Sequence, residues 1–182
     1  MAALILVIGG VRSGKSRFAE QLAAGSPPVT YLATAQAGDD EMARRIRLHR
    51  QRRAAFGQDW HTVEEPWDVA GAVAGHFRDH PDAGCVLLEC LTLWLTNLLV
   101  GLPQRPALDD AGVLAAVERL EATIAVGRGR VIAVSNEVGC GIMPVNELAR
   151  RFGDLLGEAN QRLARRAVEV YACWAGIPVR IK

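Results

Sequence analysis

The amino-acid sequence predicts an α/β fold in three layers, with a mostly parallel sheet covered by helices on both faces. Apolar strand-like runs alternate with helical patterns along almost all of its 182 residues. The first run leads into a glycine-rich turn and then a helix, which is a strand–turn–helix unit of the phosphate-binding kind. Half of the residues are apolar, which provides for a sizeable core, and the length suits a single domain over residues 1–182.

Each predicted strand is a short apolar run bounded by turn residues. In chain order, the strands are expected at Leu4–Ile8, Val29–Ala33, Trp60–Glu64, Cys85–Glu89, Arg130–Ser135, Val168–Trp174 and Val179–Lys182. The last two enclose a short turn and therefore predict an antiparallel hairpin at the edge of the sheet.

Each predicted helix begins near a capping residue, glycine or proline, and most end before the next such residue. The helices are expected at Gly14–Ala24, from Asp39 or Asp40 to Arg53, and at Trp67–Arg78, Thr92–Val100, Asp109–Val126 and Asn146–Arg166. Ligands of such sheets gather at the carboxyl ends of the strands. The segments after Ile8, Ala33, Glu89 and Ser135 are therefore expected to face a ligand.

The glycine-rich turn has the spacing of a triphosphate-binding loop. Gly9 is followed, after four residues, by Gly14, Lys15 and Ser16. Backbone N–H groups in such a loop curl around phosphate oxygens, Lys15 reaches the β- and γ-phosphates, and the Ser16 hydroxyl can bind Mg²⁺. A chance glycine turn is the alternative, but the preceding strand and the following helix favour a nucleotide site. The prediction is thus a P-loop NTPase fold of the RecA-like type.

A second cluster of functional residues falls within Met42–Arg53, where six arginines surround a single histidine. On a helix Arg45, His49 and Arg53 share one face. The arginine charges disfavour the imidazolium form, keep His49 neutral and nucleophilic, and can neutralise a polyphosphate leaving group. A histidine that attacks an α-phosphate gives a nucleotidyl-histidine. The alternative is a solvated basic helix with an incidental histidine.

Two acidic positions could serve metal or nucleotide. Glu89 ends a buried-type strand, where nucleotide hydrolases and kinases place the acid that holds Mg²⁺ directly or through water. The alternative is a strand-end acid paired with an arginine. Glu64 and Glu65 end another strand, and either could bind a nucleotide hydroxyl or metal.

Composition argues against several classes of protein. The net charge is +1, too close to neutral to indicate a nucleic-acid partner. The four cysteines have no zinc-binding spacing and are expected to be ordinary reduced thiols of a cytoplasmic protein. No apolar run approaches the ~18 residues of a membrane span, and Met1–Ile8 is expected to be a strand and not a signal peptide. His61, His76 and His80 lack partners at a recognisable spacing and are expected on the surface or in loops.

Several motifs along nearly the whole chain resemble one enzyme family. They are Gly9–Ser16, Tyr31–Ala35, Asp40–Met42, Arg45-Ile46, His49-Arg50, Trp60, Thr62–Glu64, Glu89–Leu98, Ser135–Gly139, Gly141–Pro144, Arg151-Phe152 and Asn160-Gln161. The chain is similar to the bifunctional adenosylcobinamide kinase/adenosylcobinamide-phosphate guanylyltransferases of cobalamin biosynthesis. The Cys-Leu-Thr-Leu-Trp and Ser-Asn-Glu-Val-Gly segments are much more specific to this family than the phosphate-binding loop.

The resemblance implies two reactions. ATP or GTP first phosphorylates the hydroxyl of the corrinoid substrate, adenosylcobinamide. GMP is then transferred from GTP to adenosylcobinamide phosphate through a GMP-histidine, which gives adenosyl-GDP-cobinamide and pyrophosphate. The resemblance also implies a homotrimer with sites between subunits. The phosphate-binding loop predicts Mg²⁺, and the composition predicts neither a nucleic-acid partner nor a membrane span.

The resemblance assigns roles to matching residues. His49 would carry GMP. The phosphate-binding loop adds Lys15 as a second catalytic residue, and Ser16 and Glu89 are expected to hold Mg²⁺. The nucleotide contacts would be Gly9, Gly10, Val11, Arg12, Ser13, Gly14, Lys15, Ser16, Ala33, Thr34, Ala35, Arg50, Gln51, Arg52, Arg53, Glu64 and Glu89. The family usually has Asp where this chain has Glu89, one methylene longer.

Two other functions remain open from the sequence. The first is a small-molecule P-loop kinase without the guanylyltransferase step, which would form no covalent adduct with GTP. The second is a nucleotide-switched module that grips nucleic acid with its arginine helix, which predicts strongly salt-dependent binding. The near-zero net charge and the confinement of that arginine cluster to one segment argue against the second.

Overall fold

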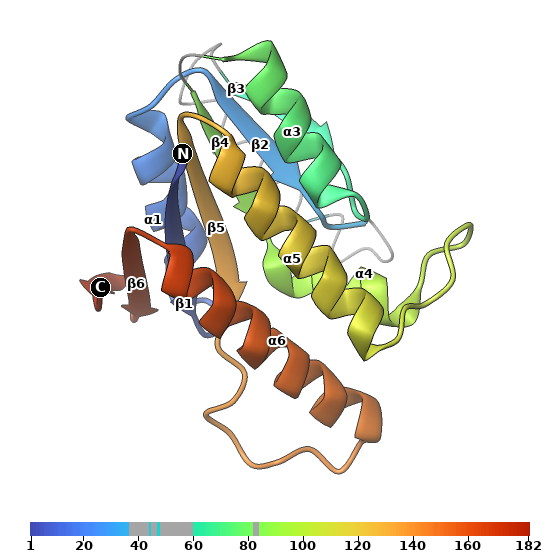
Figure 1. Ribbon diagram of the computed structural model, residues 1–182. Helices are drawn as coiled ribbons and strands as arrows, with labels where there is room; N and C mark the ends of the chain where they lie inside the picture. Colours follow the sequence, from blue (N-terminus) through green and yellow to red (C-terminus); the bar gives the residue numbers. More distant parts are fainter. Residues whose placement is uncertain (37–43, 45–46, 48–59, 82–83) are drawn as a thin grey trace.

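A computed structural model describes residues 1–36, 44, 47, 60–81 and 84–182 of the chain. Figure 1 shows a twisted sheet with helices packed along it. The strands are β1 (Ala3–Gly9), β2 (Val29–Ala33), β3 (Trp60–Glu64), β4 (Cys85–Glu89), β5 (Arg130–Asn136), β6 (Glu169–Trp174) and β7 (Ile177–Arg180). The helices are α1 (Lys15–Ala24), α3 (Val69–Asp79), α4 (Leu91–Val100), α5 (Asp110–Val126) and α6 (Glu147–Arg166).

Within the described residues the sheet has the strand order β3-β2-β4-β5-β1-β6-β7. All neighbouring strands are parallel except β6 and β7, which form the antiparallel hairpin at the edge. β1 lies between β5 and β6, so the glycine-rich turn opens at an interior position of the carboxyl edge. The mostly parallel sheet with its C-terminal edge hairpin confirms the predicted fold class.

Alternate residues of the strands supply two separate cores. Leu4 and Leu6 of β1 pack with the helices α3, α4, α5 and α6, whereas Ile5 and Val7 pack with α1 on the other face. The side-chain period of two along a strand makes this division possible, because both faces of a parallel sheet are covered. The three layers predicted from the sequence are therefore present.

Three strand predictions, Val29–Ala33, Trp60–Glu64 and Cys85–Glu89, match the structure at both ends. The last strand was expected at Val179–Lys182, but β7 begins at Ile177, because Ala175 and Gly176 form a tight turn with positive φ angles and Trp174 pairs with Ile177. The helix predicted from Asp39 or Asp40 to Arg53 falls outside the described residues, apart from Arg44 and Arg47. Both of these are helical and exposed.

The N-terminus of α3 also differs from the sequence prediction. A helix was expected from Trp67, but α3 begins at Val69. Glu65 Oε1 accepts hydrogen bonds from the backbone N–H groups of Trp67 and Asp68, both at 2.8 Å. Asp68 then caps the helix by accepting from the N–H of Gly71. Side-chain capping satisfies these backbone donors and delays the first helical turn.

His76 corrects one expectation from the sequence. It was expected on the surface, but it is only 4% exposed and its Nδ1 lies 2.7 Å from the hydroxyl oxygen of Thr30. The reason is its helical spacing from Val69 and Val73, which places all three residues on the buried face of α3. Burial first, and the charge of His80 second, lower the pKa of His76 to about 4.

This buried imidazole predicts a loss of stability in mild acid. Between pH 6.5 and about 4 the unfolded chain takes up a proton at His76 that the folded chain does not, so the free energy of unfolding falls as the pH falls. The lowered pKa corresponds to at most about 3 kcal/mol. Urea unfolding of His76→Gln from pH 4 to 7 should give a shallower pH dependence than the unsubstituted chain. Identical slopes for His76→Gln and the unsubstituted chain would contradict the prediction.

Candidate functional site

The phosphate-binding loop leaves β1 and turns into α1 at the carboxyl edge of the sheet. Gly14, the residue before the helix, has φ 91° and ψ −1°, a left-handed conformation that suits glycine. The Lys15 Nζ donates a hydrogen bond to the carbonyl of Gly10 at 3.1 Å, so its ammonium group folds over the loop. The loop backbone, the N-terminus of α1 and this ammonium together can bind a polyphosphate.

The C-terminal hairpin packs directly against this loop. The backbone N–H of Gly176, in the turn between β6 and β7, donates to the carbonyl of Ser13 at 2.9 Å. A Cβ atom at Gly14 would lie 2.8 Å from the Cα atom of Gly176. Glycine at position 14 is therefore required by its φ angle and by this close approach. Sequence analysis missed Gly176, because no local pattern shows that the chain's last turn meets its first loop.

Ser16 and Glu89 meet across the site. The Ser16 hydroxyl donates a hydrogen bond to Glu89 Oε1 at 2.8 Å, which joins the first turn of α1 to the end of β4. A hydroxyl and a carboxylate are hard oxygen ligands of the kind that Mg²⁺ takes beside nucleotide phosphates. The residues present thus fit the ion that the sequence predicted there.

A network of buried hydrogen bonds fixes the ends of the neighbouring strands. The Thr34 hydroxyl donates to the carbonyl of Cys90 and accepts from its N–H, both at 2.8 Å. The side-chain amide of Asn97 donates to the carbonyls of Thr34 and Pro66. Thr34 is fully buried, so its side chain holds the end of β2 to that of β4. Ala33 and Ala35, its neighbours, are partly exposed at the edge.

Asn136, at the end of β5, is held in the same way. Its N–H donates to the Thr92 hydroxyl at 3.0 Å, and its carbonyl accepts from the side-chain amide of Asn160 at 3.1 Å. Thr92 and Asn160 come from α4 and α6, respectively. These polar residues, like Thr34 and Asn97, belong to the motifs that carried the family resemblance. In the structure they fix the carboxyl edge of the sheet.

The thiol of Cys90 lies next to the site but is unsuited to nucleophilic chemistry. Burial first, and the charge of Glu89 second, raise the pKa of Cys90 to about 11. Burial likewise raises the pKa of Cys85 to about 12. All four cysteines are free, and Cys140 alone is exposed. Because the thiolate is the reactive form, the thiols of Cys85 and Cys90 are inert near neutral pH.

The predicted nucleotide contacts are spread along the edge. Glu64, Ala33 and Glu89 occupy the same register across β3, β2 and β4. β3 is four strands from β1. At about 4.8 Å per strand, Glu64 is about 19 Å from the start of the phosphate-binding loop. The structure thus places Glu89 in contact with Ser16, whereas Glu64 lies further along the carboxyl edge, on the outer strand β3. His49, Arg50, Gln51, Arg52 and Arg53 lie outside the described residues.

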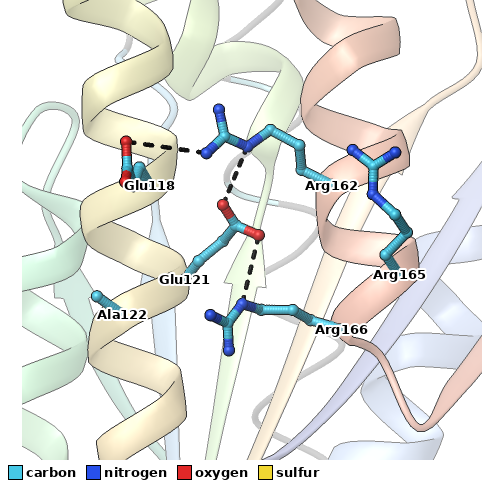
Figure 2. Close-up of a pocket in the computed structure, with 6 residues that line it drawn as sticks. All are labelled: Glu118, Glu121, Ala122, Arg162, Arg165 and Arg166. Atoms are coloured by element: carbon cyan, nitrogen blue, oxygen red, sulfur yellow. Dashed lines mark hydrogen bonds and ion pairs between the residues drawn. The ribbon is translucent and has the colours of Figure 1, made fainter.

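A separate group of charges joins α5 to α6 on the helical layer (Figure 2). The carboxylate of Glu121, which is 8% exposed, pairs with Arg162 at 3.0 Å and with Arg166 at 3.4 Å. Glu118 pairs with Arg162 from the neighbouring turn. These ion pairs link α5 to α6. Because the two arginines are paired with acids, the pocket that they line offers little net charge to a ligand.

The sequence matches known proteins over almost its whole length. The family model described as cobinamide kinase/cobinamide phosphate guanyltransferase, CobU, matches residues 5–181. The chain belongs to the CobU family. It is 47% identical to the bifunctional adenosylcobalamin biosynthesis protein CobP of Pseudomonas aeruginosa over 180 residues, which cover 97% of this chain and 96% of the relative. It is 43% identical to the CobU of Salmonella typhimurium over 98% of this chain and 99% of that relative.

A more distant structural similarity concerns the fold of this CobU family member alone. An ATP synthase subunit, NeqB, from Nanoarchaeum equitans superposes with a TM-score of 0.56 and 12% identity, over 94% of this chain and 45% of the other. The predicted P-loop NTPase fold is confirmed. No helix among the described residues has the length and apolar character to span a membrane.

Proposed function

We propose that this chain is a bifunctional enzyme that phosphorylates adenosylcobinamide with ATP or GTP and then transfers GMP from GTP to the product. The observation that carries the proposal is the 2.8 Å contact between Ser16 and Glu89 beside the phosphate-binding loop, in a chain of the CobU family. The relatives are named as bifunctional proteins, which favours two steps over a kinase alone.

In the kinase step the backbone N–H groups of Gly9–Ser16 and the ammonium of Lys15 hold the triphosphate. The substrate hydroxyl oxygen forms a bond to the γ-phosphorus while the bond to the β-phosphate oxygen breaks, and the hydroxyl proton is released. Lys15 stabilises the negative charge that grows on the bridging oxygen. Ser16 and Glu89 would hold Mg²⁺, which neutralises charge on the phosphate oxygens when bound.

In the second step His49 carries the transferred group. Its neutral ring nitrogen forms a bond to the α-phosphorus of GTP, and pyrophosphate leaves with the electron pair of the broken bond. Arg50, Arg52 and Arg53 neutralise the pyrophosphate, and Gln51 lies among them in the sequence. An oxygen of adenosylcobinamide phosphate then bonds to the same phosphorus, the P–N bond breaks, and the imidazole is regenerated. Ala33, Ala35 and Glu64 contact the nucleotide, and Thr34, which is fully buried, holds this segment in place.

The remaining parts of the proposal concern the setting of the enzyme. Residues 1–182 form a single nucleotide-binding domain, and the protein works in the cytoplasm as a homotrimer with sites between subunits. Its partners are the nucleotides and the corrinoid, and nucleic acid is not among them. These statements are supported by the family membership and by the residue pattern.

Mass spectrometry of the protein after incubation with GTP and Mg²⁺ tests the proposal. A GMP adduct should appear on the peptide that contains His49, and it should be acid-labile, as a P–N bond is. ATP in place of GTP serves as the control for non-specific labelling, and chelation of divalent metal should prevent the adduct. Cobinamide phosphorylation without any adduct would reduce the function to a kinase, and an adduct on another peptide would remove His49 from the mechanism.

A further inference from the structure

The connection between β5 and α6 displays apolar side chains to solvent. We call the segment from Glu137 to Asn146 the β5–α6 loop, and it extends away from the sheet and the helices (Figure 1). Ile142 is 98% exposed, Val145 97% and Met143 69%. Exposed apolar residues that occur singly need no explanation, but several in one loop indicate a surface that binds something.

Hydrogen bonds hold this loop at both ends. The N–H of Glu137 donates to the carbonyl of Gly9 at 3.3 Å, and the Glu137 carboxylate accepts from the N–H of Gly139 at 2.7 Å. At the other end an Nη1 group of Arg150 donates to the carbonyls of Pro144 at 3.0 Å and Val145 at 2.6 Å. The loop is therefore held by hydrogen bonds at its start and at Pro144 and Val145, next to the exposed side chains of Ile142 and Met143.

The β5–α6 loop begins beside the phosphate-binding loop. β5 lies between β1, which carries the phosphate-binding loop, and β4, which ends in Glu89. The contact between Ser16 and Glu89 lies on the β4 side of the phosphate-binding loop, and these two residues would hold a metal there. The bond from Glu137 to Gly9 makes the β5–α6 loop continuous with that site. An acceptor molecule that reaches the γ-phosphate must have its body close by.

We propose that the β5–α6 loop is the surface on which the corrin ring of the substrate lies, with Ile142, Met143 and Val145 in contact with its methyl-bearing face. The inference rests on the proposed function. The chemistry is complementary, because a corrinoid is a broad, largely uncharged ring, and the exposed side chains of the loop's middle carry no charge. A nucleotide is a poor fit for this surface, because a polyanion needs cations or N–H donors.

The double variant Ile142→Ser/Val145→Ser tests this inference, with Val126→Ser as the matched control. Val126 is 84% exposed at the end of α5, near the amino ends of the strands and away from the nucleotide site. The double variant should raise the KM for adenosylcobinamide about tenfold or more, because two apolar contacts are lost. The KM for ATP, the GTP-dependent protein adduct and the midpoint of thermal unfolding should stay unchanged. Val126→Ser should change none of these quantities.

Three outcomes would overturn the inference, and they can be told apart. An unchanged KM for adenosylcobinamide in the double variant removes the loop from substrate binding. If the double variant sediments as a smaller species than the unsubstituted protein, and its KM for adenosylcobinamide is normal at protein concentrations high enough for assembly, the loop forms a contact between copies of the chain. A raised KM for ATP assigns it to the nucleotide. If the unsubstituted protein does not phosphorylate adenosylcobinamide at all, the proposed function itself is wrong.

Discussion

Replacement of His49 by alanine is expected to abolish GMP transfer while phosphorylation of adenosylcobinamide continues. The alanine variant has no nitrogen to attack the α-phosphorus, so the covalent route is lost. We expect a decrease of at least about 10³-fold in the transferase rate, on the scale seen when an enzymatic nucleophile is removed. The kinase step uses Lys15, Ser16 and Glu89 and should proceed within about twofold of the normal rate.

The measurement is a pair of assays on one preparation, with radiolabel in the α-phosphate of GTP for the transferase and in the γ-phosphate of ATP for the kinase. His61→Ala, at an exposed position on β3, is the matched histidine control and should retain both activities. Full transferase activity in His49→Ala would refute the role assigned to this residue. Loss of both activities would show that the variant damages nucleotide binding in general.

Replacement of Lys15 by alanine is expected to slow phosphoryl transfer by about 10³-fold. Lys15 lies in the first turn of α1, and its ammonium group folds over the phosphate-binding loop. There it can stabilise the negative charge that develops on the β–γ bridging oxygen. Removal of one such preorganised donor costs about 4 kcal/mol of transition-state stabilisation. At 25 °C this amount corresponds to about three powers of ten in rate.

Arg17→Ala provides the control for a lost cation on the same helix, because Arg17 is exposed two residues further along α1. It should keep a nearly normal kinase rate. Thermal unfolding of Lys15→Ala should change little, since the side chain donates a single described hydrogen bond, to Gly10. A normal kinase rate in Lys15→Ala would mean that the loop binds phosphate for a purpose other than this reaction.

The sequence was most informative where a segment's structure depends on its own residues. Val29–Ala33 and Cys85–Glu89 are apolar runs with clear ends, and the structure gives them the predicted bounds. The spacing of Gly9, Gly14 and Lys15 likewise determines a local shape. The meeting of Ser16 with Glu89 followed from topology, because parallel strands present their carboxyl ends at the same edge.

The sequence was least informative where distant residues decide the outcome. His76 has no sequence neighbour that marks it as buried, and its contact with Thr30 depends on how α3 packs over β2. Trp67 fits a helical pattern, but capping by Glu65 and Asp68 starts α3 later. The sequence does not show that Thr34 is buried while its neighbours Ala33 and Ala35 are partly exposed, because the partner of Thr34 is the backbone of Cys90, far away in the chain.

The contact between Gly176 and Ser13 has a consequence for the newly made protein. During synthesis the phosphate-binding loop leaves the ribosome before the β6–β7 turn does, because it comes earlier in the chain. Ser13 can therefore accept this hydrogen bond only after the β6–β7 hairpin has been made. A ribosome-bound chain that ends before β6 carries the phosphate-binding sequence without this backbone contact.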